Sequence, residues 1–314
     1  MKIAGEDKAE AGAVDGDWIE VGDDHAIFVR DVGAREKPAA VFLHGGPGSG
    51  CTPEHLGFFD LSRFRVVLPD QRGAGRSRAV DRFAANTTQH LIADLEVIRE
   101  RLGIARWLVV GGSWGATLAL AYAEAHPERV TGLVLRAVFL GTRAELDWAF
   151  IEAPRRFRPE LFAEFLAFLE AGERTDPLPA FWRRLTHPSV AIRTPAAIFW
   201  NRYERALSRL LPPPGPASAP ANVPSTPSME AHYFAANCFL AENALLANAS
   251  RLADIPGIIV QGRYDLLCPP ATSFALATAW PNAELRFVED AGHTASEAPM
   301  GAALTKAIAD ISAG

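Results

Sequence analysis

The chain contains little cysteine, and its cysteines are poorly spaced for cross-linking. Cys51, Cys238 and Cys268 are the three cysteines in 314 residues. An odd number of widely separated thiols argues against a disulfide framework, and their spacing does not match a zinc site. We therefore expect free thiols in a reducing compartment, which makes the cytoplasm the default location, and we expect no metal site.

Long hydrophobic runs and clusters of basic residues are also missing from the sequence. No run approaches the roughly 18 apolar residues of a membrane-spanning helix. The stretch from Met1 to Asp17 has five acidic residues and no apolar centre, which is unlike a signal peptide. The net charge is −6, and no basic cluster is interleaved with aromatic residues. Neither a membrane nor a nucleic acid is therefore expected as a partner.

The most informative feature that the chain does have is a glycine-rich turn directly after an apolar run. Trp107-Leu108-Val109-Val110 predicts a buried strand, Gly111-Gly112-Ser113-Trp114-Gly115 follows it, and residues 116–125 predict a helix. A serine on such a strand-to-helix turn is pushed out above the sheet, and small neighbours supply the room that it needs. The pattern G-x-S-x-G is short enough to arise by chance in a plain glycine-rich loop. The flanking strand and helix nevertheless favour a nucleophile elbow.

Strands alternate with helices on both sides of this turn. A β-hairpin is expected between Trp18 and Val32, around Gly22-Asp23-Asp24, and the apolar spacing from Thr88 to Leu102 predicts a helix. Further strands are expected at residues 39–43, 65–68, 130–135, 258–260 and 285–288. This alternation predicts an α/β fold with a mostly parallel central sheet and helices on both faces.

A long segment interrupts the alternation. Residues 141–245 are rich in large aromatic side chains and predict a helical cap inserted into a core that comprises residues 1–140 and 246–314. Within the cap, residues 212–227 hold seven prolines in sixteen positions. Since proline disrupts helices and strands, we expect residues 212–227 to form an extended surface loop.

Two residues downstream of Ser113 complete a candidate catalytic triad. A nucleophilic serine needs a base, and the base needs an acid that orients it. Asp265 and His293 each follow an expected strand, and the order serine, acid, histidine is typical of one large class of serine hydrolases. Each residue has a simpler interpretation, since Asp265 can serve as a turn former and a single histidine is more often structural. Asp290 is a rival acid, but it lies only three residues before His293.

An oxyanion hole needs two backbone N–H groups directed at the developing negative charge. The N–H of Trp114, directly after the nucleophile, is the first candidate. The second is expected in the loop His44-Gly45-Gly46-Pro47-Gly48, where glycine lets the backbone approach the substrate closely. We expect Gly46 to supply it, with Gly45 as the alternative, and a plain turn is the simpler interpretation of this loop.

Five motifs together resemble the proline iminopeptidases (prolyl aminopeptidases), and the similarity extends through most of the chain. They are His44-Gly45-Gly46-Pro47-Gly48, Asp70-Gln71-Arg72-Gly73, Gly111-Gly112-Ser113-Trp114-Gly115, Gly262-Arg263-Tyr264-Asp265 and Ala291-Gly292-His293. The resemblance implies an α/β-hydrolase fold without metal or cofactor. It also implies release of an N-terminal proline from a small peptide through an acyl-enzyme.

The resemblance further implies two carboxylates that hold the substrate's free amino group. The matching residues are Glu204, in Trp200-Asn201-Arg202-Tyr203-Glu204, and Glu230, at the start of Glu230-Ala231-His232-Tyr233-Phe234. An α-ammonium has a pKa of about 7.7–8.0 and is a natural partner for carboxylates. From the sequence alone, Glu204 could equally be a solvated helix charge among neighbouring arginines.

The pocket for the proline ring is expected, by the same resemblance, to be lined by aromatic residues and an arginine. Arg136, Phe139, Phe234 and Cys268 match the pattern of the family. Ala149 departs from it, because an aromatic residue is usual after Trp148. On an ideal helix Phe150 would point about 100° away from Ala149, so we expect a wider pocket that accepts other small or apolar residues beside proline.

Two other functions share parts of this pattern. An amidase, esterase or lactonase acting on a small metabolite would use Ser113, Asp265 and His293 but would not need Glu204 and Glu230. A catalytically inactive binding module could retain the fold, although the complete triad argues against it. An epoxide hydrolase or dehalogenase is not expected, because those enzymes need a carboxylate at the elbow and this chain has Ser113 there.

Overall fold

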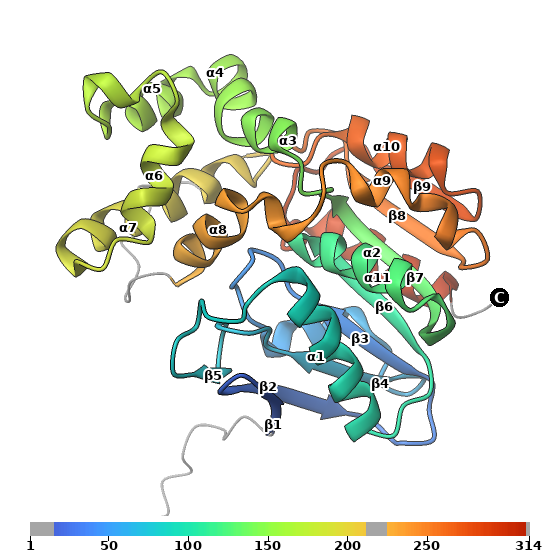
Figure 1. Cartoon of the computed structure of the whole chain (residues 1–314). Coiled ribbons are helices and arrows are strands. Elements are labelled where there is room, and N and C mark those ends of the chain that lie inside the picture. Colours follow the sequence, from blue (N-terminus) through green and yellow to red (C-terminus); the bar gives the residue numbers. More distant parts are fainter. Residues whose placement is uncertain (1–15, 212–224, 312–314) are drawn as a thin grey trace, which may run out of the picture.

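One mixed sheet organises the described part of the chain, residues 16–211 and 225–311 of a computed structural model (Figure 1). Its nine strands are β1 (Asp17–Gly22), β2 (His25–Val32), β3 (Ala39–Leu43), β4 (Arg65–Pro69), β5 (Arg78–Ala79), β6 (Trp107–Ser113), β7 (Val130–Val138), β8 (Gly257–Gly262) and β9 (Ala283–Val288). The spatial order is β1-β2-β4-β3-β6-β7-β8-β9, with β5 paired to β2. From β4 to β9 along this order, neighbouring strands pair in parallel. The expected α/β architecture with a mostly parallel sheet is therefore confirmed.

Antiparallel pairing is confined to the β1, β2 and β5 end of this sheet. The hairpin between β1 and β2 turns at Asp23 and Asp24, whose φ angles are 54° and 59°. Positive φ at both central residues belongs to the two-residue turn whose twist suits a hairpin, and aspartate tolerates it better than most residues. The expected hairpin is present.

Helices cover both faces of the sheet, because its central strands bury side chains on both sides. Val41 and Leu43 pack in the core cluster that includes α1 (Thr88–Arg101), α2 (Trp114–Ala125) and α10 (Pro270–Ala279). Ala40 and Phe42 pack in the cluster that includes α11 (Ala298–Ile311) and the 3₁₀ helix η1 (Pro53–Phe58). A further 3₁₀ turn, η2 (Pro127–Arg129), precedes β7. No helix within residues 16–211 and 225–311 is both long enough and apolar enough to cross a membrane.

Between β7 and β8 the described residues contain helices and no strand. These helices are α3 (Arg143–Asp147), the π-helical turn η3 (Trp148–Glu152), α4 (Ala153–Phe157), α5 (Pro159–Ala167), η4 (Ala171–Glu173), α6 (Pro177–Leu185), α7 (Val190–Leu207), α8 (Thr226–Ala235), η5 (Asn237–Phe239), α9 (Ala244–Ala247) and η6 (Ala249–Leu252). Figure 1 shows α4 to α7 gathered to one side of the sheet. We call residues 141–245 the cap, and its division from the core at these positions remains our proposal.

One boundary of the proline-rich segment differs from the prediction. Residues 212–224 lie outside the described part of the chain, but α8 already begins at Thr226. Pro227 therefore stands in the first turn of a helix and not in an extended loop. Proline is tolerated there because the first turn leaves its backbone N–H groups without helical partners.

Buried hydrogen bonds attach α8 to the core. The Tyr233 hydroxyl donates to Oδ1 of Asn86 at 2.6 Å, and Nε2 of His232 lies 2.7 Å from the Asn86 carbonyl oxygen. The hydroxyl of Thr88 donates to the Cys238 carbonyl at 2.5 Å. Thr88 begins α1 and Asn86 lies two residues before it, so a short core segment positions α8 and the turn that follows it.

Candidate active site

Ser113 lies at the junction of β6 and α2, as the sequence pattern predicts. Its φ and ψ angles are 57° and −125°, a sparsely populated region that is typical of strained turns at functional sites. A Cβ atom on Gly111 would lie 2.2 Å from the Gly115 carbonyl oxygen, and one on Gly115 would lie 2.0 Å from the Leu43 carbonyl oxygen. The turn therefore requires glycine at both positions.

Asp265 and His293 are hydrogen-bonded to each other. Nδ1 of His293 lies 2.8 Å from Oδ2 of Asp265, and the Asp265 side chain is buried. The other carboxylate oxygen accepts the backbone N–H groups of Leu267 and Cys268, each at 2.9 Å. Because the aspartate fixes Nδ1 as the donor, Nε2 of the neutral imidazole is the acceptor. The acid that contacts His293 is Asp265 and not its rival Asp290.

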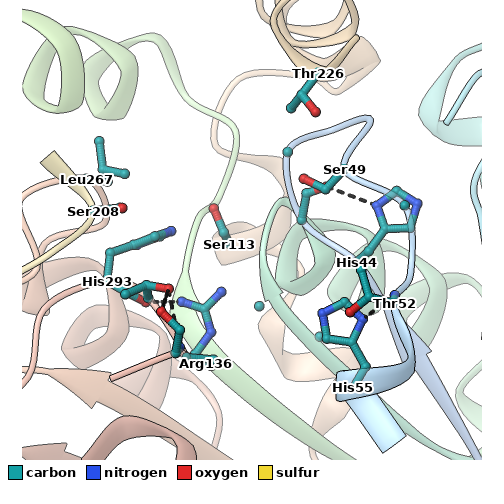
Figure 2. Close-up of a pocket in the computed structure, with 18 of the residues that line it drawn as sticks. His44, Ser49, Thr52, His55, Ser113, Arg136, Ser208, Thr226, Leu267 and His293 are labelled. Carbon is teal, nitrogen blue, oxygen red and sulfur yellow. Dashed lines mark hydrogen bonds between the residues drawn. The ribbon is translucent and has the colours of Figure 1, made fainter. Parts of the chain in front are cut away.

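Ser113 and His293 face the same cavity, which has a volume of about 510 Å³. Figure 2 shows the His293 imidazole directed toward Ser113. Backbone contacts fix the histidine from two further directions. The backbone N–H of His293 donates to the Ser208 carbonyl oxygen at 3.1 Å, and the backbone carbonyl oxygen of His293 accepts a hydrogen bond from the guanidinium of Arg136. The chain thus brings together three residues that are far apart in the sequence.

The glycine-rich loop after β3 lies beside the nucleophile. Gly45 and Gly46 line the cavity, and a Cβ atom on Gly45 would lie 3.7 Å from Cβ of Ser113. The φ angle of Gly46 is 106°, which strongly favours glycine. Trp114 begins α2, so its N–H lies next to the same turn. Both expected N–H donors, and the alternative Gly45, are therefore near Ser113.

Glu204 of α7 and Glu230 of α8 meet at the cap side of this cavity. Oε2 of Glu230 accepts the indole N–H of Trp200 at 2.7 Å, while its buried Oε1 has no hydrogen-bond partner among the described residues. Burial raises the pKa of Glu230 well above its usual value, and the adjacent Glu204 carboxyl raises it further. Burial likewise raises the pKa of Glu204, against the opposing influence of His293. The pair therefore holds its protons to higher pH than two solvent-exposed glutamates would, and a bound cation would oppose this effect.

The residues predicted for the proline pocket are only partly exposed to this cavity. Arg136 lines it, whereas the described lining does not include Phe139, Phe234, Cys268 or Ala149. Phe139 and Phe234 pack edge to face, with ring centroids 5.8 Å apart. Cys268 is buried close to Ser113. Burial raises the pKa of the Cys268 thiol, and the Ser113 hydroxyl opposes this shift. Whether these four residues bind the proline ring stays a prediction.

Phe150 does not point away from the predicted proline pocket as an ideal helix would place it. Its ring lies 4.6 Å from the ring of Trp200 and 6.3 Å from that of Phe234. Ala149 and Phe150 belong to the π-helical turn η3, in which the rotation per residue differs from that of an α-helix. Phe150 therefore packs between Trp200 and Phe234, and a wider pocket beside Ala149 stays a prediction.

Two histidines at the cavity were given no role from the sequence. His44 is buried and accepts the backbone N–H of Gln71 through Nε2 at 3.0 Å, which fixes the start of the glycine-rich loop. His55 lies in η1, where Nδ1 accepts the backbone N–H of Thr52 at 3.0 Å. The spacing Thr52-x-x-His55 is a weak capping signal, but it does not reveal that the ring faces the cavity.

Comparison with known proteins identifies similar chains. Residues 38–297 match the family profile described as the alpha/beta hydrolase fold. Proline iminopeptidase of Xylella fastidiosa is 43% identical over 88% of this chain and 90% of its own, and that of Neisseria meningitidis is 43% identical over 94% and 95%. The proline iminopeptidase-related protein of Thermus thermophilus has a solved structure. It is 23% identical to this chain, with a TM-score of 0.62 over 95% of this chain and 98% of its own, and it supports the fold alone.

Proposed function

Because this chain belongs to the proline iminopeptidase family of the α/β hydrolases, we propose that it is a serine aminopeptidase that releases N-terminal proline from small peptides. The observation that carries this proposal is the carboxyl pair of the buried Glu230 and the half-buried Glu204, which faces the same cavity as Ser113. An enzyme that binds only a neutral ester or lactone has no need of two desolvated carboxyl groups. The relatives likewise do not favour an amidase, esterase or lactonase.

The proposed first step transfers the prolyl group to Ser113. His293 Nε2 takes the hydroxyl proton while Oγ attacks the carbonyl carbon of the N-terminal residue. Asp265 stabilises the imidazolium that forms. The N–H groups of Trp114 and Gly46 are proposed to bind the oxyanion. The scissile C–N bond then breaks, and the leaving amine takes the proton from His293.

The second step restores the enzyme. His293 takes a proton from a water molecule while the oxygen of that water attacks the carbonyl carbon of the prolyl ester on Ser113. The bond between Oγ and the carbonyl carbon breaks, Ser113 regains its proton, and free proline leaves. Each step uses only groups of this chain and water.

The carboxyl pair is proposed to bind the substrate's ammonium group. The free Oε1 of Glu230 lacks a donor in the described structure, and an ammonium N–H would supply one. A bound cation also favours ionised carboxylates, opposing the effect of burial on their pKa values. Recognition of the charged amine would therefore make the enzyme an exopeptidase.

The decisive experiment compares four substrates under identical conditions: the arylamides of proline, alanine and N-acetyl-proline, and a simple aryl ester. We expect rapid turnover of the proline arylamide and little turnover of its N-acetylated form. Fast ester hydrolysis with no turnover of either free-amine amide would overturn the proposal. Labelling of Ser113 by a fluorophosphonate distinguishes an enzyme from an inactive binding module. A cytoplasmic location is part of the same proposal and can be tested by cell fractionation.

A further inference from the structure

The cavity that contains Ser113 also extends along the end of β3 and the 3₁₀ helix η1, a part to which no role has been assigned. Its wall comes from the end of β3, from η1 and from α11. The apolar side chains that line it are Phe42, Phe58 and Leu304, and the polar ones are Thr52, Glu54 and His55. Figure 2 shows Thr52 and His55 across the cavity from His293.

His55 is held rigidly in this wall. Its ring stacks on Phe42 with centroids 4.5 Å apart and an interplanar angle of 28°. Phe58 lies on a nearly parallel plane at 6.3 Å from the same ring. The Thr52 N–H fixes the in-plane rotation of the imidazole by donating to Nδ1. Stacking and hydrogen bonding together leave the side chain little freedom before any ligand arrives.

The hydrogen bond from Thr52 also determines where the imidazole carries its proton. Burial lowers the pKa of His55 to about 4, and the neighbouring His44 and Arg136 contribute to the shift. The ring is therefore neutral at pH 7. Since Nδ1 accepts a hydrogen bond, Nε2 carries the hydrogen. This donor has no hydrogen-bond partner in residues 16–211 and 225–311, and Figure 2 shows it on the edge of the ring that faces the cavity.

The proposed function fixes which part of a peptide reaches this wall. With the ammonium at Glu204 and Glu230, the acyl part of the substrate extends from Ser113 toward the cap. The leaving amine is attached to the same carbonyl carbon and must extend in another direction, away from the cap. The stretch of cavity beside η1 is available for it.

We propose that Phe42, His55 and Phe58 form the subsite for the second residue of the peptide, the one that leaves. Nε2–H of His55 donates to the main-chain carbonyl oxygen of that residue, and the stacked rings receive an apolar or aromatic side chain. This inference depends on the proposed aminopeptidase function and adds a preference for the leaving residue.

Four substrates separate the two contacts: Pro-Phe-NH₂, Pro-Leu-NH₂, Pro-Gly-NH₂ and proline anilide. The amides carry the main-chain carbonyl, while the anilide keeps an aromatic ring but has no such acceptor. For the wild type we expect kcat/KM to be higher with phenylalanine or leucine than with glycine in second position.

His55→Leu should remove the donor while leaving an apolar side chain. We expect kcat/KM for the three peptide amides to fall about 3- to 10-fold, the range for one neutral hydrogen bond, with proline anilide unchanged. His55→Gln, which retains a donor, should recover part of the loss. Phe58→Ala should instead reduce the preference for phenylalanine over glycine roughly tenfold and leave Pro-Gly-NH₂ unaffected.

His187→Leu is the matched control. His187 is also partly buried and also accepts a backbone N–H through Nδ1, from Ser189 at 3.0 Å, but it does not line the cavity. This variant should leave all four substrates unchanged. If His55→Leu lowers anilide and peptide turnover equally, His55 merely supports the fold of η1 and the subsite is wrong.

A second measurement tests the subsite after the leaving group has gone. An amine bound there can attack the prolyl-enzyme in place of water, so that the ester bond to Ser113 breaks, a C–N bond forms, and the amine proton passes through His293 to Oγ. Phenylalanine amide should therefore intercept the acyl-enzyme better than glycine amide, and His55→Leu should reduce this interception. Equal interception by both amines in the wild type would contradict the proposal. A wild type that cleaves no proline substrate would instead refute the aminopeptidase function itself.

Discussion

Buried carboxyl groups carry most of the chemistry that we propose for individual residues. Asp265 is buried but receives three hydrogen bonds, from His293 and two backbone N–H groups. Glu230 is buried, and among the described residues one of its oxygens accepts the indole N–H of Trp200 while the other has no hydrogen-bond partner. Several hydrogen-bond donors stabilise the ionised form of a buried carboxylate, which can then orient a base. A buried carboxylate with few donors is stabilised when a cation binds to it. Buried carboxyl groups are therefore proposed to have two different roles, one behind His293 and one at the cavity itself.

Replacement of the nucleophile gives the first prediction. Ser113→Ala should lower kcat for the proline arylamide by at least about 1,000-fold, because triad residues act as a unit. Thermal melting should stay close to that of the wild type, since the change removes one hydroxyl at the cavity surface. Retention of more than a few per cent of the activity in a preparation free of wild-type protein would refute the assignment.

Removal of charge at the carboxyl pair of Glu204 and Glu230 gives the second prediction. Glu204→Gln and Glu230→Gln preserve shape, so kcat/KM for the proline arylamide should fall about 30-fold or more, and any neutral ester should be affected far less. Loss of both activities to the same extent would show that these residues support the cap and do not bind the amine.

The pH dependence of the wild type tests the same pair without mutation. The pKa values of Glu204 and Glu230 are raised, so the pair gains a proton as pH falls through these elevated values, and ammonium binding weakens. The acid limb of kcat/KM should therefore lie at higher pH for the arylamide than for the ester. The ester shares the requirement for a neutral His293 but not the requirement for the carboxylates, and it serves as the internal control.

Glu124, near the C-terminal end of α2, gives a prediction about stability. It is 7% exposed, burial raises its pKa to about 8, and Oε1 has no hydrogen-bond partner within the described residues. As pH rises above the unfolded value near 4.3, the unfolded chain ionises first, so the free energy of unfolding falls until about pH 8. The total effect is at most about 5 kcal/mol.

Glu124→Gln should therefore flatten the dependence of stability on pH between 5 and 8, as measured by urea unfolding at each pH. The exposed Glu128 offers a matched control, and Glu128→Gln should leave the slope unchanged. An equal slope in wild type and Glu124→Gln would mean that water reaches the Glu124 carboxyl.

Elements that follow strong local patterns were predicted well. The strand expected at residues 39–43 is β3 with the same bounds, and the helix expected from Thr88 to Leu102 is α1 to within one residue. The alternating apolar runs and the glycines around Ser113 are short-range signals that survive without tertiary information. The two-residue strand β5 carries no such signal and was missed, as were α10 and α11.

Ala149 gives a prediction at the scale of the π-helical turn η3. We expect the wild type to accept alanine or another small apolar residue in place of N-terminal proline. Ala149→Tyr should raise the ratio of kcat/KM for proline over alanine, by an amount that corresponds to about 1–3 kcal/mol at most. Ala149→Val adds less volume to a buried position and guards against misfolding of the larger variant. An unchanged ratio would place Ala149 outside the pocket, and strict proline selectivity in the wild type would refute the widening.

The whole molecule supplies what local patterns could not. The triad of Ser113, Asp265 and His293 could be predicted from the sequence because each residue follows an expected strand. The parallel sheet brings the ends of these strands to one edge. Glu230 and His55 have no local signature of function, since the proposed role of the first depends on its meeting Glu204 from another helix and that of the second on its facing the cavity. Their positions depend on how the cap and η1 pack against the core.

Attachment of the cap to the core gives the last prediction. Tyr233 lies on α8, three residues after Glu230, and its hydroxyl donates to Oδ1 of the core residue Asn86 at 2.6 Å. Tyr233→Phe removes this bond and leaves a buried amide oxygen unpaired, which should cost about 1–3 kcal/mol of stability. Because the bond holds α8 in place, KM for the proline arylamide should rise while kcat for a neutral ester stays the same.

Tyr122→Phe is the control for this variant, since it makes the same chemical change entirely within the core. The Tyr122 hydroxyl donates to Oε1 of Glu96 at 2.6 Å, and these residues lie on α2 and α1. Tyr122→Phe should lower the melting temperature, by less because Oε1 of Glu96 keeps a hydrogen bond from Arg99 at 2.8 Å, and should leave KM for both substrates unchanged. If both variants raise KM for the arylamide equally, general destabilisation explains the effect. If only Tyr233→Phe does so, the position of Glu230 depends on a bond between cap and core, and substrate recognition is a property of the assembled molecule.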